Sequence, residues 1–589
     1  MLRLPASESP PLTVTGATAK TVEFQSTQSE IIPILQFAPF PKLLRSLERG
    51  KMAEANQPPA DKQRFDALSA LDNAKFSKSH VKAILVAGSG FFVDSYDNFV
   101  IGLMVPMIAY EYFDKSSLTS RADGWVKAAS SYGNAVGQIS FAILGDILGR
   151  KRIYGIELMV LIGGALLCGF AAWPVNGDAN NLLILLSIWR FVLGVGIGGD
   201  YPVSAVITSE FASSKRRGTM IATVFAMQGF GIIAGAVMAI IVLAAAKDSI
   251  LENGASSLGY CWRTLAAFGA IPALAAVYWR LKIPETPRYA MDVLGDTEEG
   301  ARAANQFLAS DKITTDMYVK GDGKTGFFEN FSYSFKTYFN KWANLKVLIG
   351  CAAAWFFLDI GYYGTSLNTS VVLEIIGYGS PSSTGNQKIY DDLWNRSVGT
   401  AIINLAGTVP GYWFTVYFVD KWGRKPIQYM GFALLTLLFL FMAIFFNELK
   451  TDSTAVFVVM YSFAQFFFNF GPNATTFIIP AEVFPTAVRS TGHGISAASG
   501  KVGAIIAAQC FAVIAKGSFG FKGVLYIFAA CCFMGLLFSF WVPETKNLTL
   551  EELSSLDREG IAKEDDIDPS FKDIDQNYKA VQTPGASVQ

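Results

Sequence analysis

The chain has 589 residues, of which 51% are hydrophobic and only 16% are charged, whereas soluble globular domains average about 25% charged residues. This composition argues against a soluble protein and predicts an all-α polytopic membrane protein. The 48 basic and 48 acidic residues cancel, so no overall field is expected to recruit nucleic acid or an acidic partner.

The six cysteines and two histidines form no catalytic or metal-binding pattern. The cysteines lack CxxC spacing, and His80 and His493 are isolated from each other and from other candidate ligands. A zinc site, a disulfide framework and a Ser/His/Asp set are therefore not indicated. We expect no cofactor, no metal and no catalytic residue, and hence a protein that is not an enzyme.

The first 80 residues are polar, dotted with proline and without sustained periodicity, which predicts a disordered cytosolic N-terminal tail. The apolar stretch at 31–40 is too short and too interrupted by proline to span a bilayer, and it lies too far from the start for a secretory signal. Met52 begins a segment whose sequence is typical of a cytosolic N-terminus. We predict that residues 1–51 are an upstream extension of little functional consequence.

Long apolar runs begin near residue 83, and each can supply the ~20 residues that cross a bilayer. The expected spans, in two groups of six, lie near 83–109, 124–144, 153–173, 181–207, 218–246 and 262–282, then near 345–376, 396–419, 427–447, 454–480, 488–515 and 521–542. We assign an N-terminal bundle to 81–283, a cytosolic linker to 284–344, a C-terminal bundle to 345–542 and a cytosolic tail to 543–589.

Basic clusters fall in alternate short loops between the expected spans, at 150–152, 215–217 and 421–425. Because short cytosolic loops carry an excess of lysine and arginine, these loops and both termini are predicted to face the cytosol.

Three short motifs occur twice in the same order. GDILGRK at 145–151 returns as VDKWGRK at 419–425, and Pro-Glu-Thr at 284–286 returns at 543–545. Glu210 followed by Arg217 likewise returns as Glu482 followed by Arg489. Two related halves of six spans each are the plan of secondary transporters, in which the substrate site lies near the bilayer midplane between the halves.

Few ionisable side chains lie inside the expected spans, and each costs at least ~2.5–3.5 kcal/mol at the bilayer centre. The candidates are Asp94 and Asp97 in span one, Asp200 in span four, Asp359 in span seven and Lys501 in span eleven. Such groups mark functional sites by default, although Asp94 could serve only to satisfy nearby backbone groups.

Span seven also carries Trp355 and Tyr363, which share one helical stripe with Asp359 because the three residues are spaced by four. Polar side chains in other spans are Tyr201, Gln228, Asn469 and Asn473, the last two flanking Gly471-Pro472, where we expect a kinked helix. A lone amide inside a span is more often a helix–helix contact than a ligand, and an aromatic near a span end is usually an interfacial anchor.

The GDILGRK motif, its weaker second copy and the Pro-Glu-Thr-Pro-Arg sequence at 284–288 resemble the major facilitator superfamily. The run GGDYPVSA at 198–205, followed by Ser209 and Glu210, resembles the signature of its phosphate:proton symporter family of fungi and plants. The resemblance covers about residues 80–550. It implies proton-coupled uptake of inorganic phosphate across the plasma membrane by alternating access.

The resemblance also implies roles for individual residues. The family's phosphate ligands match Tyr201, Gln228, Trp355, Asp359, Tyr363, Asn473 and Lys501. Its proton-coupling acids match Asp94, Asp97, Asp200 and Asp359. Phosphate offers mainly acceptor oxygens, so a site needs donors, and we expect Asp359 to be protonated when phosphate is bound and ionised when it has left.

Charged residues at the cytosolic ends of the spans are interpreted as salt bridges between the halves that close the inner gate. They are Asp146, Arg150, Glu210, Arg217, Arg424 and Glu482. Their alternative role is to determine topology alone. Arg190 opens a run with Gly194, Gly196 and Gly198; the glycines are interpreted as close helix packing, and pairing of Arg190 with Asp97 or Asp94 is left open.

Three other functions remain possible on these residues. A sugar or polyol porter shares the GRK and Pro-Glu-Thr motifs, but a neutral sugar does not require Lys501 near Asp359. An organic-cation carrier would suit the acids but not the lone lysine. A phosphate sensor of the same fold could keep the same site. The expected partners are inorganic phosphate, protons and the lipid bilayer, with no nucleic acid and no obligate protein partner.

Overall fold

The computed structural model describes residues 60–171, 179–308, 327–378 and 381–555. These residues are helical or irregular, and none of them is in a strand. The predicted extension at 1–51 and most of the predicted C-terminal tail lie outside the described ranges.

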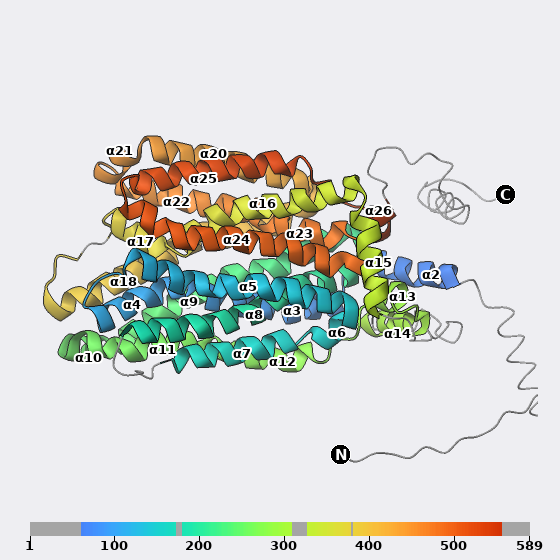
Figure 1. Ribbon diagram of the computed structural model, residues 1–589, viewed down its shortest axis with the longest axis horizontal. Helices are drawn as coiled ribbons and strands as arrows, with labels where there is room; N and C mark the ends of the chain where they lie inside the picture. The colour runs from blue at the N-terminus through green and yellow to red at the C-terminus, as the bar shows by residue number, and fades with distance from the viewer. Residues whose placement is uncertain (1–59, 172–178, 309–326, 379–380, 556–589) are drawn as a thin grey trace, which may run out of the picture. The chain divides into compact units, whose positions relative to one another are not determined.

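Six membrane-spanning segments build the N-terminal half, which occupies the lower part of Figure 1. In chain order its helices are α3 (Lys78–Phe99) with α4 (Ile101–Phe113), α5 (Ser120–Leu148), α6 (Arg150–Ile153) with α7 (Ile156–Gly169), α8 (Ala179–Phe211), α9 (Arg217–Ala245), and α11 (Leu258–Phe268) with α12 (Ala270–Arg280). The short helix α10 (Lys247–Asn253) precedes α11.

The C-terminal half repeats this plan, with most of its helices in the upper part of Figure 1. Its helices are α16 (Trp342–Ser366) with α17 (Thr369–Ile375), α18 (Gly385–Ile403) with a π-helical turn η4 (Asn404–Thr408) and α19 (Val409–Trp422), α20 (Arg424–Ile444), α21 (Phe446–Thr451), α22 (Thr454–Asn469) with α23 (Pro472–Val483), α24 (Arg489–Lys516) and α25 (Gly520–Ser539). The break between α22 and α23 confirms the interruption expected at Pro472.

Eleven of these segments are long and apolar enough to cross a membrane. Helix α5 has 29 residues but does not meet the same criterion, because it carries polar side chains such as Ser130, Asn134 and Gln138. Those side chains are fully buried, since α5 packs against α8 in its own half and against α24 in the other half. They therefore face protein rather than lipid, and the fold is the predicted two bundles of six.

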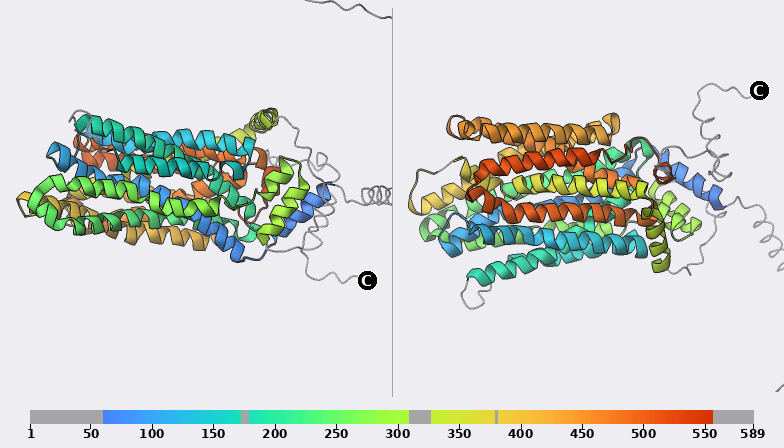
Figure 2. Two further views of the ribbon diagram at one scale, coloured as in Figure 1. Left: turned by 90° about the horizontal axis from the view of Figure 1, so that it is seen from below. Right: turned by 45° about the horizontal axis from the view of Figure 1, so that its top comes forward.

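Short helices gather at one end of the bundle, which we call the linker end (Figure 1). They are α2 (Ala60–Asp72), α13 (Pro287–Asp292), α14 (Thr297–Leu308), α15 (Phe327–Phe339) and α26 (Leu550–Ser555). Both views in Figure 2 keep α2 and the linker helices at this end. The structure thus places helices within the segments expected from sequence to be tail and linker.

Glycine lets the helices of the N-terminal half approach closely, as was predicted for the run that contains Gly194. A Cβ atom on Gly194 of α8 would lie 2.1 Å from the Ser130 carbonyl oxygen on α5, and one on Gly231 of α9 would lie 2.1 Å from the Phe92 carbonyl oxygen on α3. Neither backbone neighbour can yield without moving a helix. Gly235 differs, because the nearest atom to its Cβ position is 3.6 Å away.

We predict that Gly194→Ala lowers the free energy of unfolding by about 1–3 kcal/mol, because the new methyl group overpacks the α5–α8 contact. Thermal unfolding of the purified protein in detergent measures the change. The matched control is Gly163→Ala on α7, where no atom lies within 4 Å of the Cβ position. Equal melting temperatures for the two variants would contradict the packing argument.

Candidate functional site

A buried ion pair joins two helices of the C-terminal half, on the side that meets the N-terminal half. The Lys501 ammonium of α24 is 2.8 Å from a carboxylate oxygen of Asp359 on α16, and it donates a second hydrogen bond of 2.9 Å to the Tyr363 hydroxyl. Asp359 and Lys501 are each only 1% exposed. Removing one partner of such a pair strands the other charge away from water, which costs about 3–5 kcal/mol.

A chain of amides and phenols crosses from one half to the other beside this pair. The Gln228 amide nitrogen on α9 donates to the Tyr201 hydroxyl at 2.5 Å, and the Gln228 carbonyl oxygen accepts from the Tyr412 hydroxyl of α19 at 3.0 Å. Tyr412 in turn accepts from the Asn473 amide of α23 at 2.9 Å. Both ends of the Gln228 side chain are therefore held by phenols from different halves.

The two clusters adjoin each other. The Lys501 ammonium lies 5.5 Å from the centre of the Tyr201 ring and 4.3 Å from that of Tyr363. Trp355 and Asp359 both flank Gly500, where an added Cβ would meet the indole at 2.6 Å and the carboxylate at 2.9 Å. The structure thus brings together all seven side chains that the sequence marked as phosphate ligands, and each is at most 5% exposed.

Two members of this network were not predicted. Tyr412 follows a glycine and precedes a tryptophan, a pattern that sequence cannot distinguish from interfacial aromatics. Asn98 donates to the Tyr363 hydroxyl at 3.2 Å and accepts from Ser130 at 3.1 Å, so it ties α3 and α5 to the C-terminal half. Its only sequence signal was its place next to Asp97.

Asp200 belongs to a separate buried cluster within the N-terminal half. The Arg280 guanidinium is 2.5 Å from the Asp200 carboxylate and 3.0 Å from that of Glu157, and Ser204 donates to Asp200 at 2.5 Å. Asp94 is buried beside Asp200 and Arg280. Two carboxylates therefore share one guanidinium, and neither carboxyl oxygen of the neighbouring Asp94 has a hydrogen-bond partner within the ranges that the structure describes. Sequence missed Arg280 and Glu157 because both lie near span ends, where charged side chains commonly reach the interface.

Asp97 lies apart from this cluster, against Gly269 at the junction of α11 and α12. Arg190 approaches it from α8, but the guanidinium donates to backbone carbonyl oxygens, that of Asp97 at 3.4 Å and that of Val126 at 3.2 Å. The open question of its pairing is thereby answered: Arg190 hydrogen-bonds to the Asp97 main chain rather than to the carboxylate of Asp97 or Asp94.

The linker end is closed by contacts between the halves. Arg489 of α24 forms a 2.7 Å ion pair with Glu210 of α8. Arg150 bonds to Asp146 and Glu210 in its own half, each at 3.3 Å, and donates to the Thr486 carbonyl oxygen of the other half at 2.6 Å. All of these groups but Thr486 are at most 2% exposed.

The second copy of the motif has related geometry. Arg424 pairs with Glu482 at 2.7 Å and with Asp420 at 2.9 Å, all within the C-terminal half, while Asp420 accepts from the Thr219 backbone of the other half at 2.8 Å. The repeated Pro-Glu-Thr glutamates behave alike too. Glu285 accepts from the Arg150 backbone nitrogen at 3.2 Å, and Glu544 accepts from that of Arg424 at 3.1 Å.

These contacts correct one expectation. Of the six residues interpreted as salt bridges between the halves, Glu210 forms such a pair in the described part of the chain, and its partner is the unpredicted Arg489. Asp146 reaches across instead by accepting from the Ser490 and Thr491 backbone nitrogens, at 3.2 and 2.7 Å. Repeat symmetry could have indicated Arg489, since it is the counterpart of Arg217.

Arg217 was expected to form a salt bridge between the halves, but it contacts the flanking helices instead. Arg288 contacts the same helices. Arg217 pairs with Asp72 of α2 at 3.1 Å and donates to the Leu548 carbonyl oxygen at 2.9 Å. Arg288 of α13 pairs with Asp72 and with Glu551 of α26, each at 2.8 Å. Ion pairs thus join the helix before the first half, the linker between the halves and the helix after the second half.

No group of three or more histidine, cysteine or acidic side chains that could hold a metal ion occurs among the described residues. The donors in the central site are amides, phenols, an indole and one ammonium, a set suited to an oxyanion rather than to a cation.

Comparisons with known proteins agree with this architecture. A model of the family described as "Sugar (and other) transporter" matches residues 82–556. A repressible high-affinity phosphate permease of Neurospora crassa is 42% identical over 84% of this chain and 90% of its own length. An inorganic phosphate transporter of Saccharomyces cerevisiae is 40% identical over 87% of this chain and 89% of its own length.

A probable inorganic phosphate transporter of Arabidopsis thaliana is 41% identical over 84% of this chain and 97% of its own length. Among solved structures, a proton:xylose symporter, XylE, covers 81% of this chain and 98% of its own with a TM-score of 0.61 at 19% identity, a likeness of fold alone. The chain therefore belongs to the sugar (and other) transporter family of the major facilitator superfamily, and is closely similar to fungal and plant inorganic phosphate transporters.

Proposed function

We propose that this protein takes up inorganic phosphate together with protons, by alternating access of a central site to the two sides of the membrane. The observation that carries the proposal is the buried Lys501 ammonium, hydrogen-bonded to Asp359 and Tyr363 and surrounded by neutral donors from both halves. The named function of the relatives supports it.

Phosphate binding would exchange contacts that the side chains now make with one another. Gln228, Asn473 and the tyrosines supply amide and hydroxyl donors, Trp355 supplies an indole N–H, and Lys501 supplies the positive charge. Charge-assisted hydrogen bonds to an anion are about twice as strong as neutral ones. The ammonium is therefore the group on which we expect phosphate affinity to depend most.

Asp359 couples this binding to a proton. An ionised carboxylate neutralises Lys501 and repels an arriving anion, as in the ion pair of 2.8 Å. A proton on Asp359 removes that charge, releases the ammonium and turns the carboxyl group into a donor. Phosphate and proton are then admitted together, and each leaves more readily once the other has gone.

The energetics of uptake require such coupling. Moving a monovalent anion into a negative cell costs ~2.3 kcal/mol per 100 mV, while each unit of pH difference returns ~1.36 kcal/mol per proton. One proton only cancels the electrical term. The cluster in which Asp200 and Glu157 share Arg280 beside the buried Asp94, together with Asp97, offers places for a second proton.

The linker end is proposed to face the cytosol, because the basic clusters of the short loops lie there. Both termini then lie in the cytosol, and the transported anion enters from the opposite end. We propose the plasma membrane as the location of the protein. Glu210, Arg489 and the Asp146 contacts would close the inner gate and part when the site opens inward.

A sugar porter is the nearest alternative, since the family model and the fold likeness include sugar carriers. A neutral sugar would gain nothing from a buried ammonium paired with a carboxylate. Uptake of labelled phosphate into proteoliposomes, with and without an imposed pH gradient and with glucose and sulfate as competitors, separates the two functions.

We expect Asp359→Asn to keep measurable phosphate binding, to lose the pH dependence of that binding and to fail at concentrative uptake, because its amide mimics a permanently neutral acid. Binding across pH 5 to 8 and gradient-driven uptake in vesicles measure the three properties. Asp359→Glu should retain some coupling but bind less well. Asp452→Asn, at an exposed site, is the control. Accumulation against a gradient by Asp359→Asn would transfer the coupling role to Asp97.

Lys501→Ala is expected to abolish high-affinity phosphate binding, since it removes the positive charge and leaves Asp359 unpaired. The double variant Lys501→Ala with Asp359→Asn restores charge balance, so it should fold better than the single variant yet still bind phosphate poorly. Isothermal titration and thermal unfolding report the two effects separately. Exposed Lys450→Ala serves as control, and normal affinity in either Lys501 variant would remove this residue from the site.

Arg489→Ala is expected to open the linker end more often, because it removes the ion pair that joins the halves there. A thiol introduced as Ser490→Cys, in protein whose exposed Cys510 is replaced by serine, should then react faster with a membrane-impermeant reagent. Arg302→Ala is the control, since this arginine is 59% exposed and pairs within α14. Unchanged reactivity would show that the pair does not hold the gate.

A further inference from the structure

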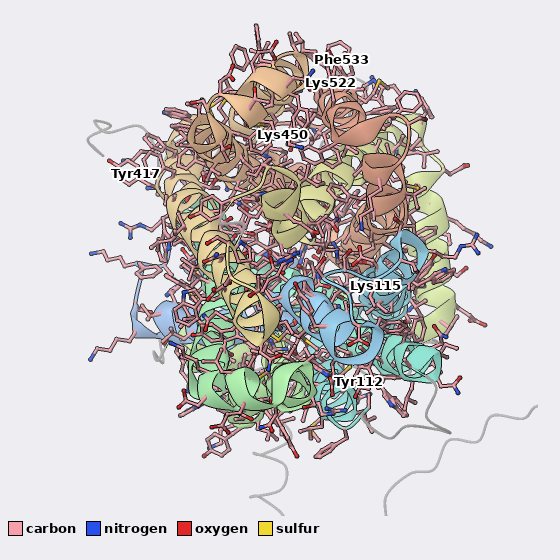
Figure 3. All side chains as sticks on the ribbon, turned by 90° about the vertical axis from the view of Figure 1, so that its left-hand side faces the viewer. Tyr112, Lys115, Tyr417, Lys450, Lys522 and Phe533 are labelled. Carbon is pink, nitrogen blue, oxygen red and sulfur yellow. The ribbon has the colours of Figure 1, made fainter. Side chains whose placement is uncertain are left out.

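A small cavity lies between the halves at the end opposite the linker helices, the end that faces the viewer in Figure 3. It has room for about one water molecule, about 10 Å³. Its polar wall consists of Ser116, Ser117, Asp123, Lys127, Ser370, Arg396 and Lys516. Three cations and one acid thus meet at the external mouth of the interface, and Lys501 is not among the residues that line the cavity.

Lys127 is the unusual member of this group. It lies on α5, seven residues after the helix begins at Ser120, and is only 1% exposed. Its ammonium contacts Asp123 at 2.8 Å and the Asn368 side-chain oxygen of the other half at 2.8 Å. The second contact exists only while the halves are closed at this end. When they part, Lys127 loses a neutral partner and is exposed to water.

The other two cations are placed on the C-terminal half. Arg396 of α18 is held by Asp392 and Glu374, each at 2.9 Å, so its charge is already balanced. Lys516, at the exposed end of α24, contacts the Ser117 hydroxyl of the N-terminal half at 3.2 Å. Lys127 and Lys516 therefore line the cavity from different halves, together with Ser116, Ser117 and Ser370.

We propose that these residues form an outer anion site, which binds phosphate at the external mouth when the halves part there and delivers it to the central site. The inference rests on the proposed function. A cation at the mouth of a narrow, low-dielectric passage raises the local concentration of anions and their association rate. Lys127 is the principal ligand, Lys516 assists it, and Asp123 limits the affinity so that the anion moves on.

Two variants distinguish this site from a structural salt bridge. If Asp123 and Lys127 only support the closed state, Lys127→Gln and Asp123→Asn break the same pair and change transport in the same direction. In an anion site they act in opposite directions. Removing the ammonium weakens capture of phosphate, whereas removing the carboxylate leaves the ammonium unopposed and strengthens it.

The experiment measures initial rates of phosphate uptake by the full chain in proteoliposomes, at two ionic strengths. At low salt we expect Lys127→Gln to raise KM about threefold or more with little change in maximal rate, Asp123→Asn to lower KM, and both differences to shrink at high salt. Lys127→Arg should stay near wild type. Lys450→Gln, which removes an exposed charge from the same end (Figure 3), should change nothing.

The outcomes separate the two proposals. Wild-type protein that takes up no phosphate overturns the proposed function and the outer site with it. Normal wild-type uptake with a KM that moves in the same direction in Lys127→Gln and Asp123→Asn, or with an unchanged KM in both, overturns the outer site alone. In equilibrium phosphate binding in detergent, the component that depends on Lys501 is expected to be unchanged in both variants, and loss of that component in Lys127→Gln would also overturn the outer site.

Discussion

The ion pair between Asp359 and Lys501 is the interaction on which the centre of the molecule depends. Both side chains are removed from water and lie on adjacent helices of one half. Neither charge could remain there alone, because a buried charge without a partner is strongly destabilising. The pair therefore allows the protein to keep a positive charge buried between its helices.

Because charged and polar groups in the site are buried, they must find partners within the protein, and the surrounding side chains supply these partners. Amides and phenols around the pair satisfy one another, with Gln228 and Tyr412 closing the network across the halves. At the linker end, Arg489 and Glu210 bring the halves together, and at the opposite end Lys127 and Asn368 do so. The network of amides and phenols is thus enclosed between contacts that join the halves at both ends.

Much of this could be predicted from the sequence because the membrane restricts the possibilities. Long apolar runs indicate the spans, and repeated motifs indicate the two halves. Charged residues inside spans, such as Asp359 and Lys501, are easy to notice because burying a charge in the bilayer is costly and such residues are rare. Which side chains contact one another was harder to predict. Arg280 and Glu157 lie far apart in sequence yet bind each other, and Tyr412 resembles an ordinary interfacial aromatic; only three-dimensional packing distinguishes them.

One feature of the linker end bears on how the protein can be shortened. Asp72 precedes the first span and Glu551 follows the last, yet both carboxylates contact the single guanidinium of Arg288. Trimming the chain past either acid would unbalance the same buried arginine, so the two ends of the sequence are equivalent in this respect. A shortened protein that preserves this charge balance must include both Asp72 and Glu551.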